Sequence, residues 1–282
     1  DYPCSACEAD RGTSGSKPLG LTSRETGETL MSMDKTGRSK SGGRHEQSAP
    51  HPSRLTPHEL VIGVLGGTGK AGSGLAFRWA LKGHEVIIGS RSAERAAAAA
   101  EELTRLLPGR GRVRDATNRE AAQAASVVVL AVPYAAQVAT AETVRDCLHG
   151  KILVDVTVPL VPPKVDRVQL PGGESAVLAL QRKLGESVKV VSAFQNVSAT
   201  HLKDLSHAID CDVLVCGDDA TAREIVIKLA HDAGLRAWHA GPLANSVAAE
   251  ALTSVLIAIN KRYKVSGAGF RITGVPPQSG ER

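Results

Sequence analysis

Three glycines near the start of the apolar part of the chain have a spacing that suits phosphate binding. Gly67, Gly69 and Gly72 form a G-x-G-x-x-G pattern, and Gly66 stands directly before it. An apolar run of strand length precedes the pattern, and an amphipathic stretch of helical period follows it. In this context the glycines allow a tight turn and let the backbone approach a pyrophosphate, which the N–H groups of the helix N-terminus then bind. We therefore expect a dinucleotide site here, rather than a glycine turn without a ligand.

The end of the next apolar run indicates which dinucleotide binds. Residues 85–89 are followed by Ser90 and Arg91, and Arg95 stands one helical turn later. A site for NAD usually has Asp or Glu at this point, which accepts from the ribose 2′-OH. A hydroxyl and two guanidinium groups instead suit a 2′-phosphate, since hydrogen bonds to charged groups are worth about 1.5–3 kcal/mol each. Cations are disfavoured at a helix N-terminus, so these arginines indicate an anionic partner rather than solvated surface charge, and we expect NADP.

Strand-length apolar runs alternate with helical patterns from residue 60 onward. Such alternation predicts a mostly parallel sheet with helices on both faces. Two of the runs, VVVLAV and KILVDV, are continuously apolar, as strands buried on both sides are. The expected fold is α/β: a Rossmann-like, doubly wound sheet with a smaller C-terminal α/β part that ends in a long helix near Lys264. The runs are residues 60–65, 85–89, 112–116, 127–132, 151–156, 188–194, 212–217 and 236–241.

Composition divides the chain into segments. Residues 1–58 are rich in Ser, Gly, Thr, Pro and charge and have no apolar period, so we expect a disordered N-terminal arm. Residues 59–194 are expected to form the NADP-binding domain. Residues 195–274 would be the C-terminal part, which completes the cleft where an acceptor binds beside NADP. Residues 275–282 would be a loose tail.

The overall composition argues against several classes of protein. The net charge of +5 is spread without a dense Lys/Arg block, and aromatic residues are only 3%, so a nucleic-acid surface is not expected. No uninterrupted apolar run approaches the length of a membrane span, and no signal peptide is visible. The five cysteines fit a reducing compartment. We expect a cytoplasmic protein that acts on small molecules.

Other candidate residues favour structural roles. Asp218 and Asp219 suit a helix N-cap better than a metal pair. Glu250 on the last helix has no evident partner and is expected to be a solvated or interface carboxylate. Cys4 and Cys7 lack the second pair that a zinc site needs, so we expect no metal site. The histidines His201, His207, His231 and His239 match no metal motif and are expected at the surface or in packing.

Six segments together resemble a known enzyme family. They are VLGGTGKAGSGLA, GHEVIIGSRSAERA, LAVPY, VVSAFQNVSATHL, VCGDD and AGPLANS, in this order between about residues 60 and 274. In this combination the chain resembles the NADPH-dependent reductases of coenzyme F420, the deazaflavin:NADP oxidoreductases. The resemblance implies an enzyme that passes hydride directly between the nicotinamide of NADP(H) and coenzyme F420, by positioning the two rings and without a catalytic side chain.

The resemblance also implies which residues bind. Gln195 stands where archaeal members of the family have a His that contacts the deazaflavin, and Asn196 and Val197 follow it; Gln195 and Val197 are the expected substrate-binding residues. An amide can still donate and accept hydrogen bonds, so a role for Gln195 is expected. The expected cofactor-binding residues are Gly67, Thr68, Gly69, Lys70, Ala71, Gly72, Ser90, Arg91, Arg95, Val132, Pro133, Tyr134, Val138, Ala199 and Leu243.

Two alternatives to this function follow from these residues. Gln195 leaves room for an NADPH-dependent reductase of a flavin or of another acceptor. A module that senses NADP(H) without chemistry would carry the same glycine turn, because a fold does not determine function. The run from Gly241 to Leu243 favours an enzyme, since a sensor needs no second ligand pocket. The apolar stripe of the last helix can pack either against the sheet of its own chain or against the same helix of a second chain. The resemblance favours the second arrangement, a homodimer.

Overall fold

The computed structural model describes residues 59–109 and 111–275 of the chain. By its internal contacts the chain divides into residues 1–51 and residues 52–282, and the described residues belong to the second unit. The expected arm over residues 1–58 and all of the expected tail except residue 275 lie outside the described residues.

One eight-stranded sheet runs through the described part of the chain, in the order β3-β2-β1-β4-β5-β6-β7-β8. Every neighbouring pair is parallel except β6 and β7, which are antiparallel. The order reverses between β1 and β4, as in a doubly wound Rossmann-like sheet, which confirms the expected fold class. The strands, each within an expected apolar run or one residue longer, are β1 Val61–Leu65, β2 Glu85–Ser90, β3 Val113–Thr117, β4 Val127–Leu130, β5 Ile152–Asp155, β6 Lys189–Ser192, β7 Asp212–Gly217 and β8 Arg236–His239.

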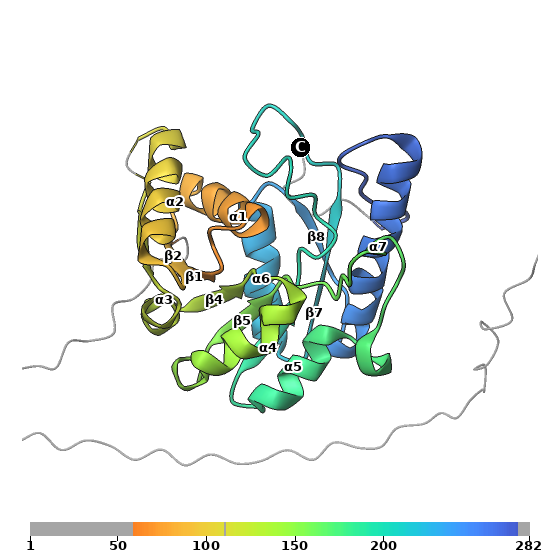
Figure 1. Cartoon of the computed structure of the whole chain (residues 1–282), viewed down its shortest axis with the longest axis horizontal. Coiled ribbons are helices and arrows are strands. Elements are labelled where there is room, and N and C mark those ends of the chain that lie inside the picture. The colour runs from red at the N-terminus through yellow and green to blue at the C-terminus, as the bar shows by residue number, and fades with distance from the viewer. Residues whose placement is uncertain (1–58, 110, 276–282) are drawn as a thin grey trace, which may run out of the picture. The chain divides into compact units, whose positions relative to one another are not determined.

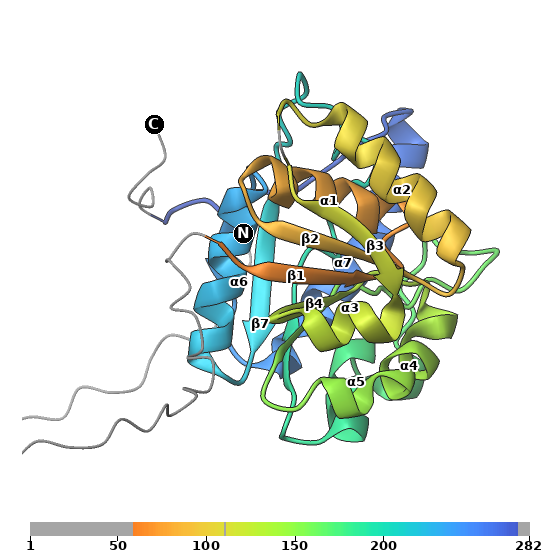
Figure 2. The ribbon, with the colours of Figure 1, turned by 90° about the vertical axis from the view of Figure 1, so that its left-hand side faces the viewer.

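Helices cover both faces of this sheet (Figure 1). Helices α1, α2 and α6 contribute buried residues to one core, and α3, α4 and α5 contribute to the other. Figure 2 shows α1 and α2 on one side of the strands and α3, α4 and α5 on the other. The helices are α1 Lys70–Leu81, α2 Ala93–Leu106, α3 Asn118–Ala124, α4 Tyr134–Thr143, α5 Ala176–Leu184, α6 Ala220–Asp232 and α7 Ser246–Tyr263.

The part of the sheet beyond β6 is held by a buried carboxylate. Asp212, at the start of β7, is 1% exposed and accepts hydrogen bonds from Arg236 Nε at 2.7 Å and from Trp238 Nε1 at 2.7 Å. The N–H of Ile272 donates to the same carboxylate at 2.7 Å, so the segment after α7 is fastened here as well. The domain boundary expected between residues 194 and 195 thus falls between two strands of one continuous sheet.

The long last helix is confirmed, but its carboxylate is not where the sequence places it. Glu250 is 1% exposed instead of solvated. Its Oε2 accepts from the N–H of Ala176 at 2.8 Å and its Oε1 from the N–H of Val177 at 3.1 Å, in the first turn of α5. The hydroxyls of Ser175, the N-cap of α5, and Ser246 lie 2.7 Å apart beside it. These N–H groups have no partner within α5, so the two hydrogen bonds from them to Glu250 fasten α7 to α5.

The outer side of α7 is apolar. Val255, Ile259 and Tyr263 are 43%, 37% and 71% exposed. The segment Leu243–Tyr263 is long enough and apolar enough to cross a membrane. Core helices of soluble proteins can have the same length and composition. The expectation that the protein does not span a membrane therefore stays a prediction.

The buried Glu250 makes stability depend on pH. Burial is the main cause that raises its pKa from 4.5 to about 7, and the nearby Asp155 adds to the effect. The folded state therefore binds this proton more tightly than the unfolded state does. The stability that protonated Glu250 contributes is complete below pH 4.5 and is lost as the pH rises through about 7. Because Glu250→Gln cannot ionise, we expect its stability relative to the wild type to increase over this pH range, by up to about 3 kcal/mol.

Urea unfolding of both proteins at several pH values measures this difference. Glu224→Gln, at an exposed position on α6, controls for the removal of one negative charge. A stability difference between Glu250→Gln and the wild type that stays constant with pH would contradict the assignment.

Candidate functional site

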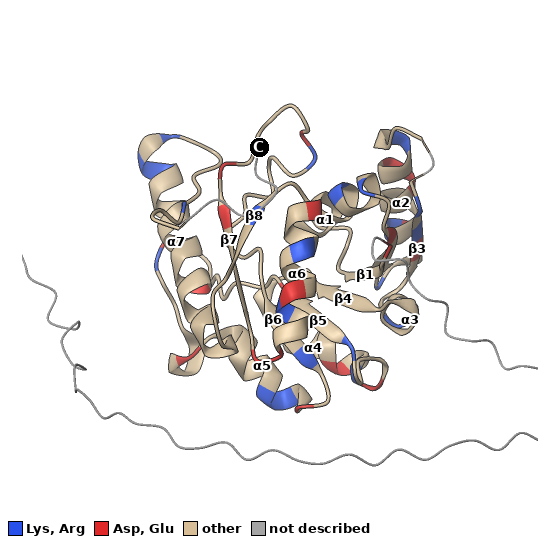
Figure 3. Ribbon diagram, turned by 180° about the vertical axis from the view of Figure 1, so that it is seen from behind, with Lys and Arg blue, Asp and Glu red and all other residues tan. Residues whose placement is uncertain are grey.

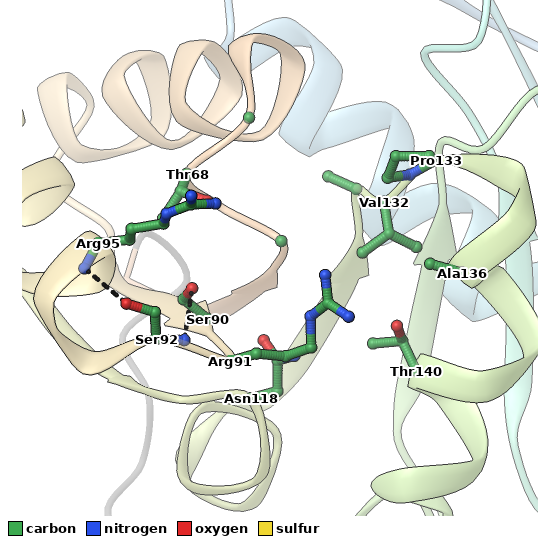
Figure 4. Close-up of a pocket in the computed structure, with 13 residues that line it drawn as sticks. Thr68, Ser90, Arg91, Ser92, Arg95, Asn118, Val132, Pro133, Ala136 and Thr140 are labelled. Atoms are coloured by element: carbon green, nitrogen blue, oxygen red, sulfur yellow. Dashed lines mark hydrogen bonds between the residues drawn. The ribbon is translucent and has the colours of Figure 1, made fainter.

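A cavity of about 440 Å³ lies at the carboxyl ends of β1, β2 and β4, where the strand order reverses (Figure 4). Ligands of open α/β sheets bind at this kind of position. Thirteen residues line the cavity, among them two arginines and no acidic residue, so it favours an anion. Seven of the expected cofactor-binding residues line it: Thr68, Gly69, Ser90, Arg91, Arg95, Val132 and Pro133.

The glycine turn has the geometry of a pyrophosphate cradle. Gly66 has φ +74°, and a Cβ there would lie 2.6 Å from Val132 Cγ1, so this position requires glycine. A Cβ on Gly72 would lie 3.0 Å from Gly67 Cα, which shows how closely α1 packs on the turn. At Gly69 a Cβ would contact only Gly66 O, at 3.4 Å. The protein itself therefore does not require glycine at 69, and the open space beside the N-terminus of α1 is available to a phosphate.

The end of strand β2 and the residues directly after it form the polar part of the cavity lining. Ser90 is 8% exposed, and its Oγ accepts from the N–H of Ser92, the N-cap of α2, at 3.2 Å. The Arg91 guanidinium projects into the cavity toward Val132, and Arg95 lies beside Thr68 (Figure 4). A hydroxyl and two cations thus border the same space, as the sequence predicts.

Three lining residues carry no recognisable sequence signal. Asn118 follows β3, and the β2–β3 register, which pairs Ser90 with Thr117, brings it beside the arginines. Its Oδ1 is buried without a hydrogen-bond partner. Ala136 and Thr140, on α4, form the opposite wall. Only the strand register and the packing of α4 bring these residues to the cavity.

Other expected cofactor residues lie outside the cavity lining. Tyr134 and Val138 are half-buried on α4, and Ala199 is half-buried in the segment after β6. Leu243 is fully buried in the core, and its N–H donates to Asp218 Oδ1 at 2.9 Å. Of the glycine segment, Gly67 is buried in the turn and Gly72 in the first turn of α1, while Lys70 is exposed and Ala71 half-buried at the start of α1.

Gln195 is held tightly just beyond β6. Phe194, before it, has φ +71°, a conformation that side chains rarely adopt and that is frequent at functional sites. Gln195 is 5% exposed, and its Nε2 donates to Asp155 O and to Ser192 Oγ, both at 2.8 Å. Its Oε1 is buried without a partner. Because both N–H groups bond protein acceptors, the amide has only an acceptor left to offer.

The strand register places Gln195 along the same edge as the cavity. Leu130 of β4 pairs with Asp155 of β5, which pairs with Ser192 of β6. Neighbouring strands lie about 4.8 Å apart, so the end of β6 is about 10 Å from the cavity wall that follows β4. That distance suits a ligand that extends from the glycine turn across the strand ends. Val197, the second expected substrate-binding residue, stands two residues after Gln195 and is half-buried.

The remaining polar candidates have structural partners. Asp219 caps α6 by accepting from the N–H of Ala222 at 2.7 Å, which confirms the N-cap expectation for this residue, whereas Asp218 accepts from the N–H of Leu243 instead. His201 stacks on His207 with 3.9 Å between ring centroids, and His239 accepts from Arg223. Within the described residues, no three His, Cys, Asp or Glu side chains are grouped to hold a metal ion.

Comparison with known proteins agrees with this geometry. The family described as "NADP oxidoreductase coenzyme F420-dependent" matches residues 61–159. The F420-dependent NADP reductase of Methanocaldococcus jannaschii is 43% identical over 223 residues, which cover 77% of this chain and 99% of that protein. The protein of the same name from Methanothermobacter marburgensis is 41% identical over 223 residues, 77% of this chain and 100% of that protein.

A solved structure shows the same likeness. The structure of a putative F420-dependent NADP reductase from Arthrobacter has a TM-score of 0.62 and 29% identity, and the match covers 77% of this chain and 99% of that one. The match to full-length relatives thus extends well beyond the dinucleotide turn. The chain belongs to the family of F420-dependent NADP reductases.

Proposed function

We propose that the protein transfers a hydride directly between NADP(H) and the deazaflavin coenzyme F420. The observation that carries this proposal is the acid-free cavity with two arginines at the strand-order reversal, in a chain that matches F420-dependent NADP reductases over their whole length. The two coenzymes supply the redox chemistry, and the protein supplies binding and orientation.

The NADP side of the site is proposed from the cavity. Thr68, Gly69, Lys70 and Ala71, at the N-terminus of α1, would bind the pyrophosphate, with Gly67 and Gly72 shaping the turn. Ser90, Arg91 and Arg95 would bind the 2′-phosphate by charge-assisted hydrogen bonds. Val132, Pro133, Tyr134 and Val138 would line the inner side of the cofactor, with Ala199 and Leu243 toward the nicotinamide. Leu243 is fully buried in the core, so its contact with the nicotinamide would be made from within the wall of the site.

The acceptor side is proposed at Gln195 and Val197. The unpartnered Oε1 of Gln195 supports this role, because a buried acceptor without a donor is costly unless a ligand or water supplies one. Since this atom only accepts, we propose that it takes a hydrogen bond from a donor of the bound coenzymes, such as the ring N–H of the deazaflavin.

Three mixtures test the function. The protein is incubated with NADPH and either oxidised coenzyme F420, flavin mononucleotide or no acceptor, and NADPH absorbance is followed. Loss of NADPH only with F420 supports the proposal. Loss with the flavin alone would assign a different acceptor, and binding of NADPH without turnover in any mixture would indicate a sensing module.

Cofactor choice is expected to depend on Arg91. In Arg91→Asp the new carboxylate can accept from the ribose 2′-OH and repels a 2′-phosphate, so the ratio of the NADPH and NADH dissociation constants should shift toward NADH by about tenfold or more. Fluorescence titration with each nucleotide measures the ratio. Arg105→Asp, at an exposed position on α2 outside the cavity lining, is the matched control. An unchanged NADPH affinity in Arg91→Asp would show that the 2′-phosphate is not bound there.

Turnover is expected to depend on Gln195. Gln195→Ala should lower kcat with F420 by about tenfold to 100-fold, because a ring misplaced by about 1 Å loses that much rate, while NADPH affinity stays nearly unchanged. Gln195→His should keep activity, since the resemblance implies a His at this position in archaeal members of the family. Steady-state kinetics with each substrate varied measures these effects.

Gln181 provides the matched control for Gln195. Its amide donates to Gly185 O and Val188 O and accepts from the N–H of Val190, so it only closes the connection before β6. Gln181→Ala should lower the melting temperature and leave kcat unchanged. If Gln195→Ala behaves in the same way, Gln195 belongs to the fold and not to the site.

We also propose a cytoplasmic homodimer. The free thiols of Cys147, Cys211 and Cys216 support a reducing compartment. The exposed apolar side of α7, with Val255 and Ile259, supports a contact with a second copy, because two-fold dimers are the commonest oligomers.

Sedimentation tests the dimer. The wild type should sediment as a dimer at micromolar concentration, and Val255→Asp should sediment as a monomer because a carboxylate is costly to bury. Leu205→Asp, at an exposed apolar position in a different segment, should leave the dimer intact. A wild type that is monomeric at this concentration would contradict the proposal.

A further inference from the structure

A fully buried aspartate lies between the two sides of the proposed site. Asp155 is the last residue of β5, is 0% exposed, and pairs with Leu130 of β4 on one side and Ser192 of β6 on the other. Strand β4 leads into the cavity wall, and β6 leads to Gln195. Strand β5, between them, therefore ends in an ionisable group. Neither the glycine turn nor the resemblance to known reductases predicts a role for this group.

The carboxylate of Asp155 holds the cofactor side. Its Oδ2 accepts from Gln137 Nε2 at 2.5 Å, and Gln137 stands on α4 between Ala136 and Thr140, which both line the cavity. Its Oδ1 accepts from the N–H of Thr157 at 2.8 Å. The Thr157 hydroxyl in turn lies 3.5 Å from the carbonyl oxygen of Val132, another lining residue. Two bonds from one carboxylate thus position the back of the cavity wall.

The main chain of Asp155 holds the acceptor side. Its carbonyl oxygen accepts from Gln195 Nε2 at 2.8 Å, and this bond determines which way the amide faces, because the amide oxygen would be repelled by another carbonyl. Ser192 Oγ accepts from the same Nε2 at 2.8 Å, and Thr253 of α7 donates to the main-chain carbonyl of Gln195 at 3.0 Å. Asp155 and Ser192 therefore set the orientation of the Gln195 amide, and α7 holds its main chain.

A carboxylate at this position has a cost that a purely structural residue would avoid. Burial raises the pKa of the Asp155 carboxyl, which shows that removing its charge from water is unfavourable. Well-packed apolar side chains often replace buried charges without loss of stability. The aspartate is thus explained by what its bonds position, rather than by a contribution to the core.

We propose that Asp155 is a positioning residue that holds the cofactor wall and Gln195 at a fixed separation for hydride transfer. This inference rests on the proposed function. Without the carboxylate, α4 and the Val132 segment lose their common anchor, and the two rings lose their mutual placement while each binding surface remains. The rate of hydride transfer should fall much more than the affinity for NADPH.

Three variants separate positioning from folding. Asp155→Ala removes both bonds of the carboxylate. Asp155→Asn keeps the shape, and both bonds survive if the amide of Gln137 turns over so that its oxygen accepts. Gln137→Leu removes the bond to α4 and leaves Asp155 in place, which provides a test even if Asp155→Ala does not fold. Asp212→Asn is the matched control, since that buried aspartate fastens β8 and Ile272 without touching the cavity.

The full-length proteins are compared by kcat and KM with NADPH and F420, by NADPH titration and by melting temperature. Asp155→Ala and Gln137→Leu should lower kcat by about tenfold or more while the NADPH dissociation constant changes less than about threefold, and Asp155→Asn should recover most of the rate. Asp212→Asn should lower the melting temperature and keep kcat.

Two results would overturn the inference. One is wild-type kcat in Gln137→Leu or in folded Asp155→Ala. The other is a kcat that follows melting temperature across all variants, Asp212→Asn included. Wild-type protein that does not oxidise NADPH with F420 would refute the proposed function itself, and an active wild type with insensitive variants would refute the positioning role alone.

Discussion

The parallel register of β4, β5 and β6 is the constraint on which the rest of the site depends. Leu130, Asp155 and Ser192 stand side by side, so the chain leaves three adjacent strands at the same edge. Hydrogen-bonded strands allow little freedom in this spacing, and a register shift by one residue would turn every side chain to the other face. The cavity wall after β4 and the Gln195 segment after β6 inherit their separation from this register.

Electrostatics divides the site into two regions. The open cavity has two arginines and no acid in its lining, which favours a phosphorylated ligand. Behind it lie two buried carboxylates, Asp155 and Glu250, each bonded to N–H donors of other elements. In Figure 3 the acidic position of α7 is surrounded by residues that are neither acidic nor basic. The cations therefore line the cavity, while Asp155 bonds α4 and Glu250 joins α7 to α5.

Much of this organisation could be predicted from the sequence. Each of the eight strands overlaps an expected run, and β4, which is buried throughout, is continuously apolar. The glycine turn and the arginines also have local patterns that physical chemistry explains. What could not be predicted depends on contacts between distant segments. Asn118 reaches the cavity only through the β2–β3 register, and the partners of Glu250 are backbone N–H groups more than 70 residues away. A backbone donor leaves no residue type to recognise, which is why Glu250 resembles a surface acid in sequence.

Direct transfer of the hydride between two rings held at one sheet edge is the central claim of this account. It is tested most directly by a single turnover with NADPH that carries deuterium at the transferred position of the nicotinamide, followed by mass spectrometry of the reduced deazaflavin. Because the hydride would pass from carbon to carbon without reaching solvent, the account predicts that the deuterium appears on the deazaflavin in an amount equal to the NADPH oxidised. Deuterium found in the water, with unlabelled reduced deazaflavin, would contradict it.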